Sequence, residues 1–409
     1  MSIQLVSANI KNFRSLGDVK FDFRDLTILV GCNSSGKSNS LEALSILSLI
    51  LKLGSPPPAE FMQRLLRFGK NEDIIFSISV KEDKKIAEYT VSVTLEEGKL
   101  YYSREQLLIG RHKVIEVKNG AGIVRDEKGK NPQIYKSKAG YLALRSAGDF
   151  GDRPFTAKLA EFIKNWDFYD LDPEVMRGNN MLVIGDKNFL LDPENIPSLG
   201  SRGKEIENVL QYWAEYDLEK FQLVSQELDD CMGISLKLVG EEEKIIKLSD
   251  NHTLEINLFN LRERTIKVLE KGSLEIPLSN MSDGTFRIMA YYVLLYQDNL
   301  PTLIGIEEPE RNLHPGLLRE VASVVKRLSQ KTQVIITTHS SQLLDCFNLD
   351  EINSDVSVLL LSKIDDVGTQ AFPVDELGKS RDDLSEWMRD FGVGSAIYHS
   401  HLLQGILEQ

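Results

Sequence analysis

The chain has 409 residues, of which 42% are hydrophobic and 27% are charged, a composition typical of a globular protein with room for two or three domains. Its net charge of −13 should repel nucleic acid and anionic membranes, so any contact with them needs a local patch. No apolar run approaches the ~18 residues of a membrane span, and the N-terminus lacks the features of a signal peptide. The three cysteines, Cys32, Cys231 and Cys346, have no spacing typical of disulfide frameworks or zinc sites. We therefore expect a cytoplasmic protein without membrane contact.

The first hundred residues predict strands around one helix. Residues 3–30 indicate strand, turn and strand, ending in the apolar run 26–30. Apolar residues at helical spacing after Lys37 predict a helix that ends at Gly54. Alternating β-branched and aromatic residues then predict three antiparallel strands, at 74–80, 86–95 and 98–109.

The rest of the chain divides into an irregular part and an α/β part. In residues 111–274, one amphipathic stretch, 206–228, predicts a single helix of about 25 residues. From Leu303 onward, short apolar strands alternate with helices, which is typical of a mostly parallel, doubly wound α/β sheet. We therefore expect three segments, namely an N-terminal core half (1–110), an inserted α+β lid or arm (111–274) and a C-terminal core half (275–409).

A glycine-rich loop follows the apolar run 26–30. Residues 31–38, GCNSSGKS, match GxxxxGK[ST], in which backbone N–H groups at a helix N-terminus surround phosphate oxygens. Lys37 would reach the β- and γ-phosphates of ATP, and the Ser38 hydroxyl would bind Mg²⁺. The predicted nucleotide contacts here are Gly31, Asn33, Ser34, Ser35, Gly36, Lys37, Ser38 and Asn39.

A second apolar strand, 303–306, ends in Glu307 and Glu308. This places two carboxylates at the carboxyl edge of the sheet, beside the phosphates. We predict that Glu307 binds the metal and that Glu308 polarises the attacking water. His339 also follows an apolar strand, where its imidazole could hydrogen-bond the γ-phosphate; a structural histidine is the alternative.

A serine-capped turn, Ser282-Asp283-Gly284-Thr285, precedes the helical pattern RIMAYYVLLY. A helix N-terminus of this kind can bind an anion, although an ordinary capped helix explains the pattern equally well.

The order and spacing of these elements resemble the ABC-type ATPase heads of the RecF, SMC and OLD-like group, including the predicted ATPases grouped as AAA_15 and AAA_21. The resemblance rests on NFRS at 12–15, the P-loop, SDGT at 282–285 and EEPExxLHP at 307–315. It extends more loosely to NWDFYDLDPEVMR at 165–177. The acid pair is Glu-Glu where many heads have Asp-Glu, and no glutamine stands out as a Q-loop residue.

The resemblance implies further roles. Arg14 would touch the nucleotide phosphates, Ser282 and Gly284 would cap the γ-phosphate of a partner subunit, and His339 would be the switch histidine. Two chains would form a head-to-tail homodimer around two ATP molecules, with higher oligomers open. Residues 111–274 carry no sustained heptads, which argues against long coiled-coil arms. No acidic set typical of a TOPRIM nuclease follows His339, so we expect no nuclease activity.

These features predict an ATP-hydrolysing switch that dimerises on ATP. The resemblance implies that it controls a separate effector protein, in bacterial anti-phage defence or a toxin-type system. The alternative is a RecF-like repair factor that loads on DNA. A transporter subunit is disfavoured, because it would need a membrane partner near a Q-loop.

One segment could contact nucleic acid. Residues 111–145 contain nine basic and three acidic side chains, with Tyr135 and Tyr141 interleaved. A solvated loop face is the commoner meaning of such a run. The basic residues are Arg111, Lys113, Lys118, Arg125, Lys128, Lys130, Lys136, Lys138 and Arg145.

Overall fold

The computed structural model describes residues 3–53, 57–67, 72–96, 99–137, 141–149, 154–178, 196–245, 260–270, 274–380 and 382–399. The chain forms two compact units. Unit 1 comprises Met1–Phe168, Pro301–Arg311 and Val325–Gln409, and unit 2 comprises Tyr169–Leu300 and Asn312–Val324.

Unit 1 contains a six-stranded sheet whose four consecutive strands β14, β15, β3 and β16 are parallel. These strands are almost entirely buried and apolar, as parallel strands covered on both faces are. The order is β10 (Trp166–Tyr169), β14 (Leu303–Glu307), β15 (Gln333–Thr338), β3 (Leu26–Val30), β16 (Val356–Ile364) and β17 (Gly368–Pro373), the last antiparallel.

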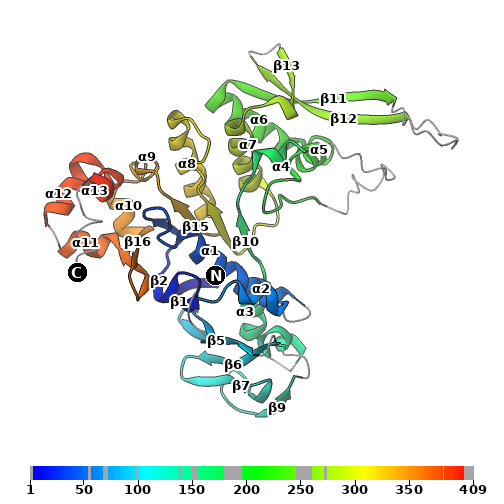
Figure 1. Ribbon diagram of the computed structural model, residues 1–409. Coiled ribbons are helices and arrows are strands. Elements are labelled where there is room, and N and C mark those ends of the chain that lie inside the picture. Colours follow the sequence, from blue (N-terminus) through cyan, green and yellow to red (C-terminus); the bar gives the residue numbers. More distant parts are fainter. Residues whose placement is uncertain are drawn as a thin grey trace. The chain divides into compact units, whose positions relative to one another are not determined.

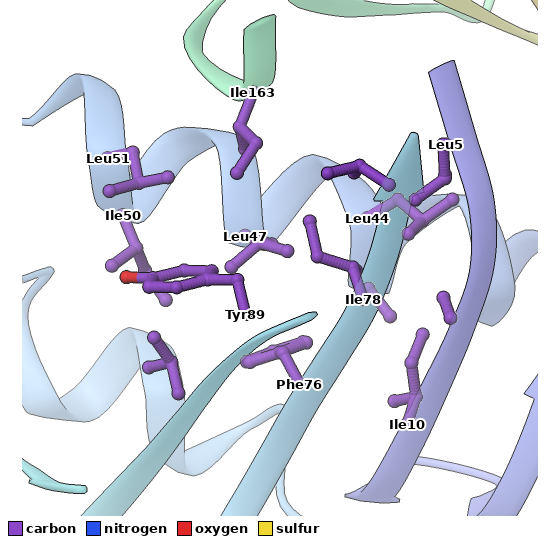
Figure 2. Close-up of a cluster of buried hydrophobic side chains, with 14 of the residues drawn as sticks. Leu5, Ile10, Leu44, Leu47, Ile50, Leu51, Phe76, Ile78, Tyr89 and Ile163 are labelled. Atoms are coloured by element: carbon purple, nitrogen blue, oxygen red, sulfur yellow. The ribbon is translucent and has the colours of Figure 1, made fainter. Parts of the chain in front are cut away.

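The second sheet of unit 1 is antiparallel throughout its eight strands. Helix α1 (Lys37–Lys52) contributes apolar side chains such as Leu44, Leu47 and Leu51 to a core shared with this sheet (Figure 2). The strand order is β2 (Leu16–Asp22), β1 (Gln4–Phe13), β4 (Ile74–Glu82), β5 (Lys85–Glu96), β6 (Lys99–Ile109), β7 (His112–Lys118), β8 (Ala121–Val124) and β9 (Gln133–Lys136).

The remaining helices of unit 1 are short. They are α2 (Ala59–Gln63), η1 (Leu144–Asp149), α3 (Pro154–Lys164), α9 (Ser341–Leu344), α10 (Leu349–Ser354), α11 (Val374–Ser380), α12 (Asp382–Phe391) and α13 (Val393–His399). The division between the units falls within α8 (Leu318–Ser329).

Unit 2 contains α7 (Asp283–Tyr296; Figure 1). Residues 285–295 of this helix are all buried. Helices α4 (Pro173–Met176), α5 (Ile206–Tyr216) and α6 (Leu218–Met232) contact it. The unit also contains the short helices η3 (Leu278–Asn280) and η4 (Pro315–Leu317) and an antiparallel sheet of β11 (Ile234–Ile245), β12 (Asn260–Glu270) and β13 (Leu274–Pro277).

Two features differ from the sequence-based expectation. The expected 25-residue helix is two helices, because Asp217 leaves helical geometry (φ −146°, ψ 69°) and accepts a hydrogen bond from the Lys220 N–H as the cap of α6. The compact units also divide the chain elsewhere than at residue 110, because β7–β9 continue the sheet begun by β1. The segment 282–285 belongs to unit 2.

Candidate nucleotide-binding site

Strand register brings three predicted segments to one edge of the six-stranded sheet. Thr337 of β15 pairs with Glu307 of β14, and Thr338 pairs with Val30 of β3. Gly31, Glu308 and His339 each follow directly, so the glycine loop, the acid pair and the histidine share the carboxyl edge. This is where open α/β sheets bind ligands.

The loop 31–38 folds around the Lys37 ammonium. Lys37 Nζ donates to the carbonyl oxygens of Gly31 (2.8 Å) and Cys32 (3.0 Å). Burial lowers the pKa of Lys37, and nearby acidic groups, led by Glu308, oppose this shift. Gly36 enters α1 with φ 105°, and a Cβ there would lie 2.3 Å from Thr369 Oγ1. The loop therefore requires glycine at this position.

The loop tip is open and its base is held by hydrogen bonds. Cys32, Asn33 and Ser34 are exposed, whereas Ser35 is buried and its hydroxyl has no hydrogen-bond partner among the described residues. A buried donor without a partner is rare in proteins, and at a phosphate loop it fits a phosphate oxygen.

A chain of three hydrogen bonds connects the glycine loop to Ser15 and Thr369. Asn39 Nδ2 donates to Ser15 Oγ (2.8 Å), Ser15 Oγ bonds Thr369 Oγ1 (3.0 Å), and Thr369 Oγ1 donates to the Ser35 carbonyl oxygen (2.9 Å). The Asn39 amide thus bonds the NFRS segment, and its predicted nucleotide contact stays a prediction. Sequence reasoning missed Ser15 and Thr369, because these hydrogen bonds span more than 300 residues of chain.

The predicted metal ligands meet directly. Ser38 Oγ donates to Glu307 Oε1, so a hydroxyl and a carboxylate converge at the start of α1. Oxygen donors of this kind suit Mg²⁺, which usually completes its coordination with phosphate and water. In the described part of the chain no cluster of three or more His, Cys, Asp or Glu forms a separate metal site.

Glu308 has a left-handed backbone (φ 40°), which is uncommon outside glycine and concentrates at functional sites. Its N–H donates to Thr337 Oγ1 (3.1 Å). Its carboxylate contacts Arg311 Nε (3.2 Å) and His339 Nδ1 (3.3 Å). The predicted base and the predicted histidine therefore lie side by side.

Glu310 is a site residue that sequence reasoning missed. It is 8% exposed, and its Oε1 accepts hydrogen bonds from Thr338 Oγ1 (2.6 Å) and the His339 N–H (3.2 Å). The same oxygen lies 3.7 Å from His339 Nδ1, and Oε2 is buried without a partner among the described residues. Glu310 thus fixes the loop that carries His339, and the motif EEPE was its only signal.

Arg14 lies near the start of α1. Arg14 Nη2 forms an ion pair with Glu42 Oε1 on α1 (2.6 Å). Burial raises the pKa of Glu42, and the Arg14 charge opposes this while Glu307 adds to it. Arg14 and Glu307 therefore both act on Glu42. The predicted phosphate contact of Arg14 stays a prediction.

The segment 282–285 lies in unit 2. Ser282 caps α7, and its Oγ accepts from the Thr285 N–H (3.2 Å). Asp283 is held by Arg177 and by Asn312 Nδ2 (3.2 Å), and Arg177 also donates to the Met281 carbonyl oxygen (3.0 Å). Arg177 is the last residue of the NWDFYDLDPEVMR stretch, so that stretch supports this turn.

The basic segment 111–145 is partly neutralised. Lys113 and Arg125 both pair with Glu116 (2.9 and 2.7 Å). At the end of β9, a shallow pocket of about 360 Å³ is lined by residues including Tyr135, Lys136, Tyr141 and Arg145. Lys138 lies outside the described residues.

Together the parallel sheet, the phosphate loop and the acid pair define an ABC-type P-loop ATPase head of the RecF and SMC-like group. The chain belongs to the family described as "AAA domain, putative AbiEii toxin, Type IV TA system", whose model matches residues 26–345. The match confirms the resemblance indicated by the motifs. No curated protein matches the sequence.

A solved structure shares this fold. An Smc head domain with an extended coiled coil, bound to the C-terminal domain of ScpA and derived from Pyrococcus furiosus, is 14% identical with a TM-score of 0.50, covering 95% of this chain and 100% of that chain. An SmcHead bound to the C-winged helix domain of ScpA (14%, TM-score 0.48, coverage 92% and 99%) and the SMC head domain from Thermotoga maritima (13%, 0.44, 90% and 98%) also match. None of the described helices is long and apolar enough to cross a membrane.

Proposed function

We propose that the chain is an ATP-driven switch subunit that binds ATP with Mg²⁺ and hydrolyses it. The observation that carries this proposal is the shared sheet edge, where Glu308, His339 and the glycine loop that contains Lys37 each follow one of three neighbouring strands. Such an edge supplies a cation for the phosphates, a carboxylate for the water and a donor for the γ-phosphate.

In the proposed reaction Glu308 accepts a proton from water as the water oxygen bonds the γ-phosphorus and the bond to the β–γ bridging oxygen breaks. Its contact with His339 Nδ1 (3.3 Å) holds the carboxylate and the imidazole together at the γ-phosphate. Lys37 stabilises charge on the β- and γ-phosphates. Ser38 and Glu307 would hold Mg²⁺, which neutralises phosphate charge when bound.

We further propose that two chains close head-to-tail on ATP, with Ser282 and Gly284 of one capping the γ-phosphate in the other. The capped N-terminus of α7 supports this role, because helix N-termini favour anions. A Cβ at Gly284 would lie 3.3 Å from Leu313 Cδ2, so a larger residue would disturb this turn.

The output of the cycle is proposed to be control of a separate effector protein in bacterial anti-phage defence or a toxin-type system. The family description names a putative toxin and a type IV toxin–antitoxin system, which supports this setting. A solved head of this fold binds another protein, ScpA, which illustrates how such a head can act on a partner.

A RecF-like DNA-loading ATPase is the second candidate. The pocket at the end of β9 favours it, since Lys136 and Arg145 lie beside the aromatic rings of Tyr135 and Tyr141. Cations next to aromatic rings suit single-stranded nucleic acid.

The deciding experiment is a native pull-down of the Glu308→Gln chain with ATP, split into nuclease-treated and untreated halves. This variant should remain in the closed, ATP-bound state. A stoichiometric protein that survives nuclease treatment would support effector control. Recovery of nucleic acid alone would replace that proposal with DNA loading.

A further inference from the structure

Helix α13 is fixed at its start to the segment that follows His339. Asp345, directly after α9, accepts hydrogen bonds through Oδ1 from the N–H groups of Gly394 (2.7 Å) and Ser395 (3.3 Å). These are among the first N–H groups of α13, which have no partner within the helix. The Asp345 carboxylate therefore ties α13 to α9.

The backbone of α13 also packs directly on Ser341, two residues after His339. A Cβ added at Gly394 would lie 2.0 Å from the Ser341 carbonyl oxygen and 2.6 Å from its Cα. Because these are backbone atoms, they cannot turn aside as a flexible side chain would. Glycine at 394 is what allows this close approach.

One turn further along, Tyr398 reaches the glycine loop. Gly394 and Tyr398 are four residues apart and so share a face of the helix. The Tyr398 hydroxyl is buried, lies close to the backbone of Gly31, and has no hydrogen bond of good geometry among the described residues. Burial raises the pKa of Tyr398, and the nearby Cys32 and Glu310 add to this shift, so the phenol stays neutral and can donate.

The neighbouring Glu310 also has a buried oxygen, Oε2, without a partner among the described residues. Glu310 Oε1 bonds the His339 N–H. Helix α13 therefore adjoins the histidine segment through Gly394 and the glycine loop through Tyr398, and Glu310 lies within electrostatic range of the Tyr398 hydroxyl. Buried polar atoms normally have partners, so a small change in the loop that supplies one is favoured.

We propose that α13 couples the glycine loop to the His339 segment, with Tyr398 as a positioning residue that bonds the Gly31–Cys32 backbone or Glu310 when nucleotide occupies the loop. This rests on the proposed ATPase function. A shift of the loop on phosphate binding moves Tyr398, and the rigid, capped helix passes that shift to Ser341 and thereby to His339.

The test is steady-state ATP hydrolysis and equilibrium ATP binding by the full chain carrying Tyr398→Phe, which removes one oxygen. We expect kcat to fall about three- to tenfold, the scale of one lost hydrogen bond, with the Kd for ATP changed less than about twofold and the thermal midpoint unchanged. Tyr216→Phe in unit 2 is the matched control and should keep wild-type kcat. Wild-type kcat in Tyr398→Phe, or a lower thermal midpoint with unchanged kcat, would overturn the coupling.

Gly394→Ala provides an independent perturbation, because its Cβ must push α13 away from Ser341. We expect it to lower kcat at least as much as Tyr398→Phe, and the double variant to be no worse than Gly394→Ala alone, since both break one connection. Multiplicative losses would contradict a shared role.

Lys37→Ala separates the two proposals. If it leaves ATP binding intact, the ATPase proposal fails; if it abolishes binding while kcat of Tyr398→Phe is normal, only the coupling fails.

Discussion

Two places in unit 1 differ in whether their buried polar groups have hydrogen-bond partners. In the antiparallel sheet, Glu105 is 1% exposed and accepts hydrogen bonds from Tyr89 Oη (3.0 Å) and the N–H groups of Ala143 (2.6 Å) and Leu144 (2.8 Å). At the edge of the parallel sheet, Ser35 Oγ and Glu310 Oε2 are buried without partners among the described residues.

A buried polar group that has hydrogen-bond partners serves the structure, whereas one without partners is available to a ligand. A buried carboxylate with three donors fixes the turn at 143–144 against β6 and needs nothing more. Buried atoms without partners beside a phosphate loop remain able to form hydrogen bonds with a ligand. Four experiments test this contrast.

The largest effect is expected at Lys37. Lys37→Ala removes the ammonium that the loop carbonyls hold and should abolish ATP binding, because the β- and γ-phosphates lose the cation of the glycine loop. Isothermal titration with ATP measures this. An affinity within about twofold of wild type would show that the loop does not bind phosphate.

Glu308→Gln should retain ATP binding and slow hydrolysis at least ~100-fold, the scale of losing a general base. The amide keeps the size of the carboxylate but cannot take the proton from water. Phosphate release under saturating ATP is the readout, with Glu88→Gln, at an exposed position of β5, as a matched control. Near-normal turnover would assign the base to another residue.

Alkylation of Cys32 should weaken ATP binding at least about tenfold, because an added group would crowd the loop whose Cys32 carbonyl holds Lys37. Bound ATP should protect the thiol. The Cys32→Ser chain, treated identically, controls for modification at Cys231 and Cys346. Full binding after confirmed modification of Cys32 would contradict this geometry.

The remaining effect concerns stability and not ATP binding or hydrolysis. Burial raises the pKa of Glu105 to about 7, although its hydrogen bonds oppose this. A folded pKa above the unfolded value means that the stabilisation is complete below about pH 4.5 and is lost as the pH rises through about 7. Relative to Glu105→Gln, the wild-type free energy of unfolding should therefore fall by up to ~3 kcal/mol across this range.

Denaturant unfolding from about pH 4.5 to 8 measures this difference, with Glu88→Gln as the control that should follow wild type. If wild type and Glu105→Gln lose stability in parallel, the Glu105 carboxylate does not titrate in this range.

Sequence predicted the nucleotide edge because its parts obey local rules. Apolar strands followed directly by Gly31, Glu308 and His339 place these residues at strand ends, and parallel pairing then aligns the ends. The structure brings these predicted residues together, while their catalytic roles stay predictions. The class of fold followed from the same alternation of strands and helices.

The residues that support this edge could not be predicted in the same way. Thr369 and Tyr398 lie more than 300 residues after the glycine loop in the sequence. No periodicity in the sequence predicts a contact over such a separation. Arg177 reaches the turn at 282–285 from a segment with no chemical motif of its own. The single-helix prediction failed for a local reason, since Asp217 bonds the backbone and starts a new helix.

Because β15 pairs with a strand on each side, its length should change little during evolution. Side chains alternate along a strand, so deleting one residue from 333–338 would slip the register and turn every following side chain to the opposite face. His339 would then lose its contact with Glu308, although no residue had been substituted. Insertions and deletions should therefore accumulate in exposed hairpin turns such as Asp83–Lys84, and the interior strands should keep their lengths.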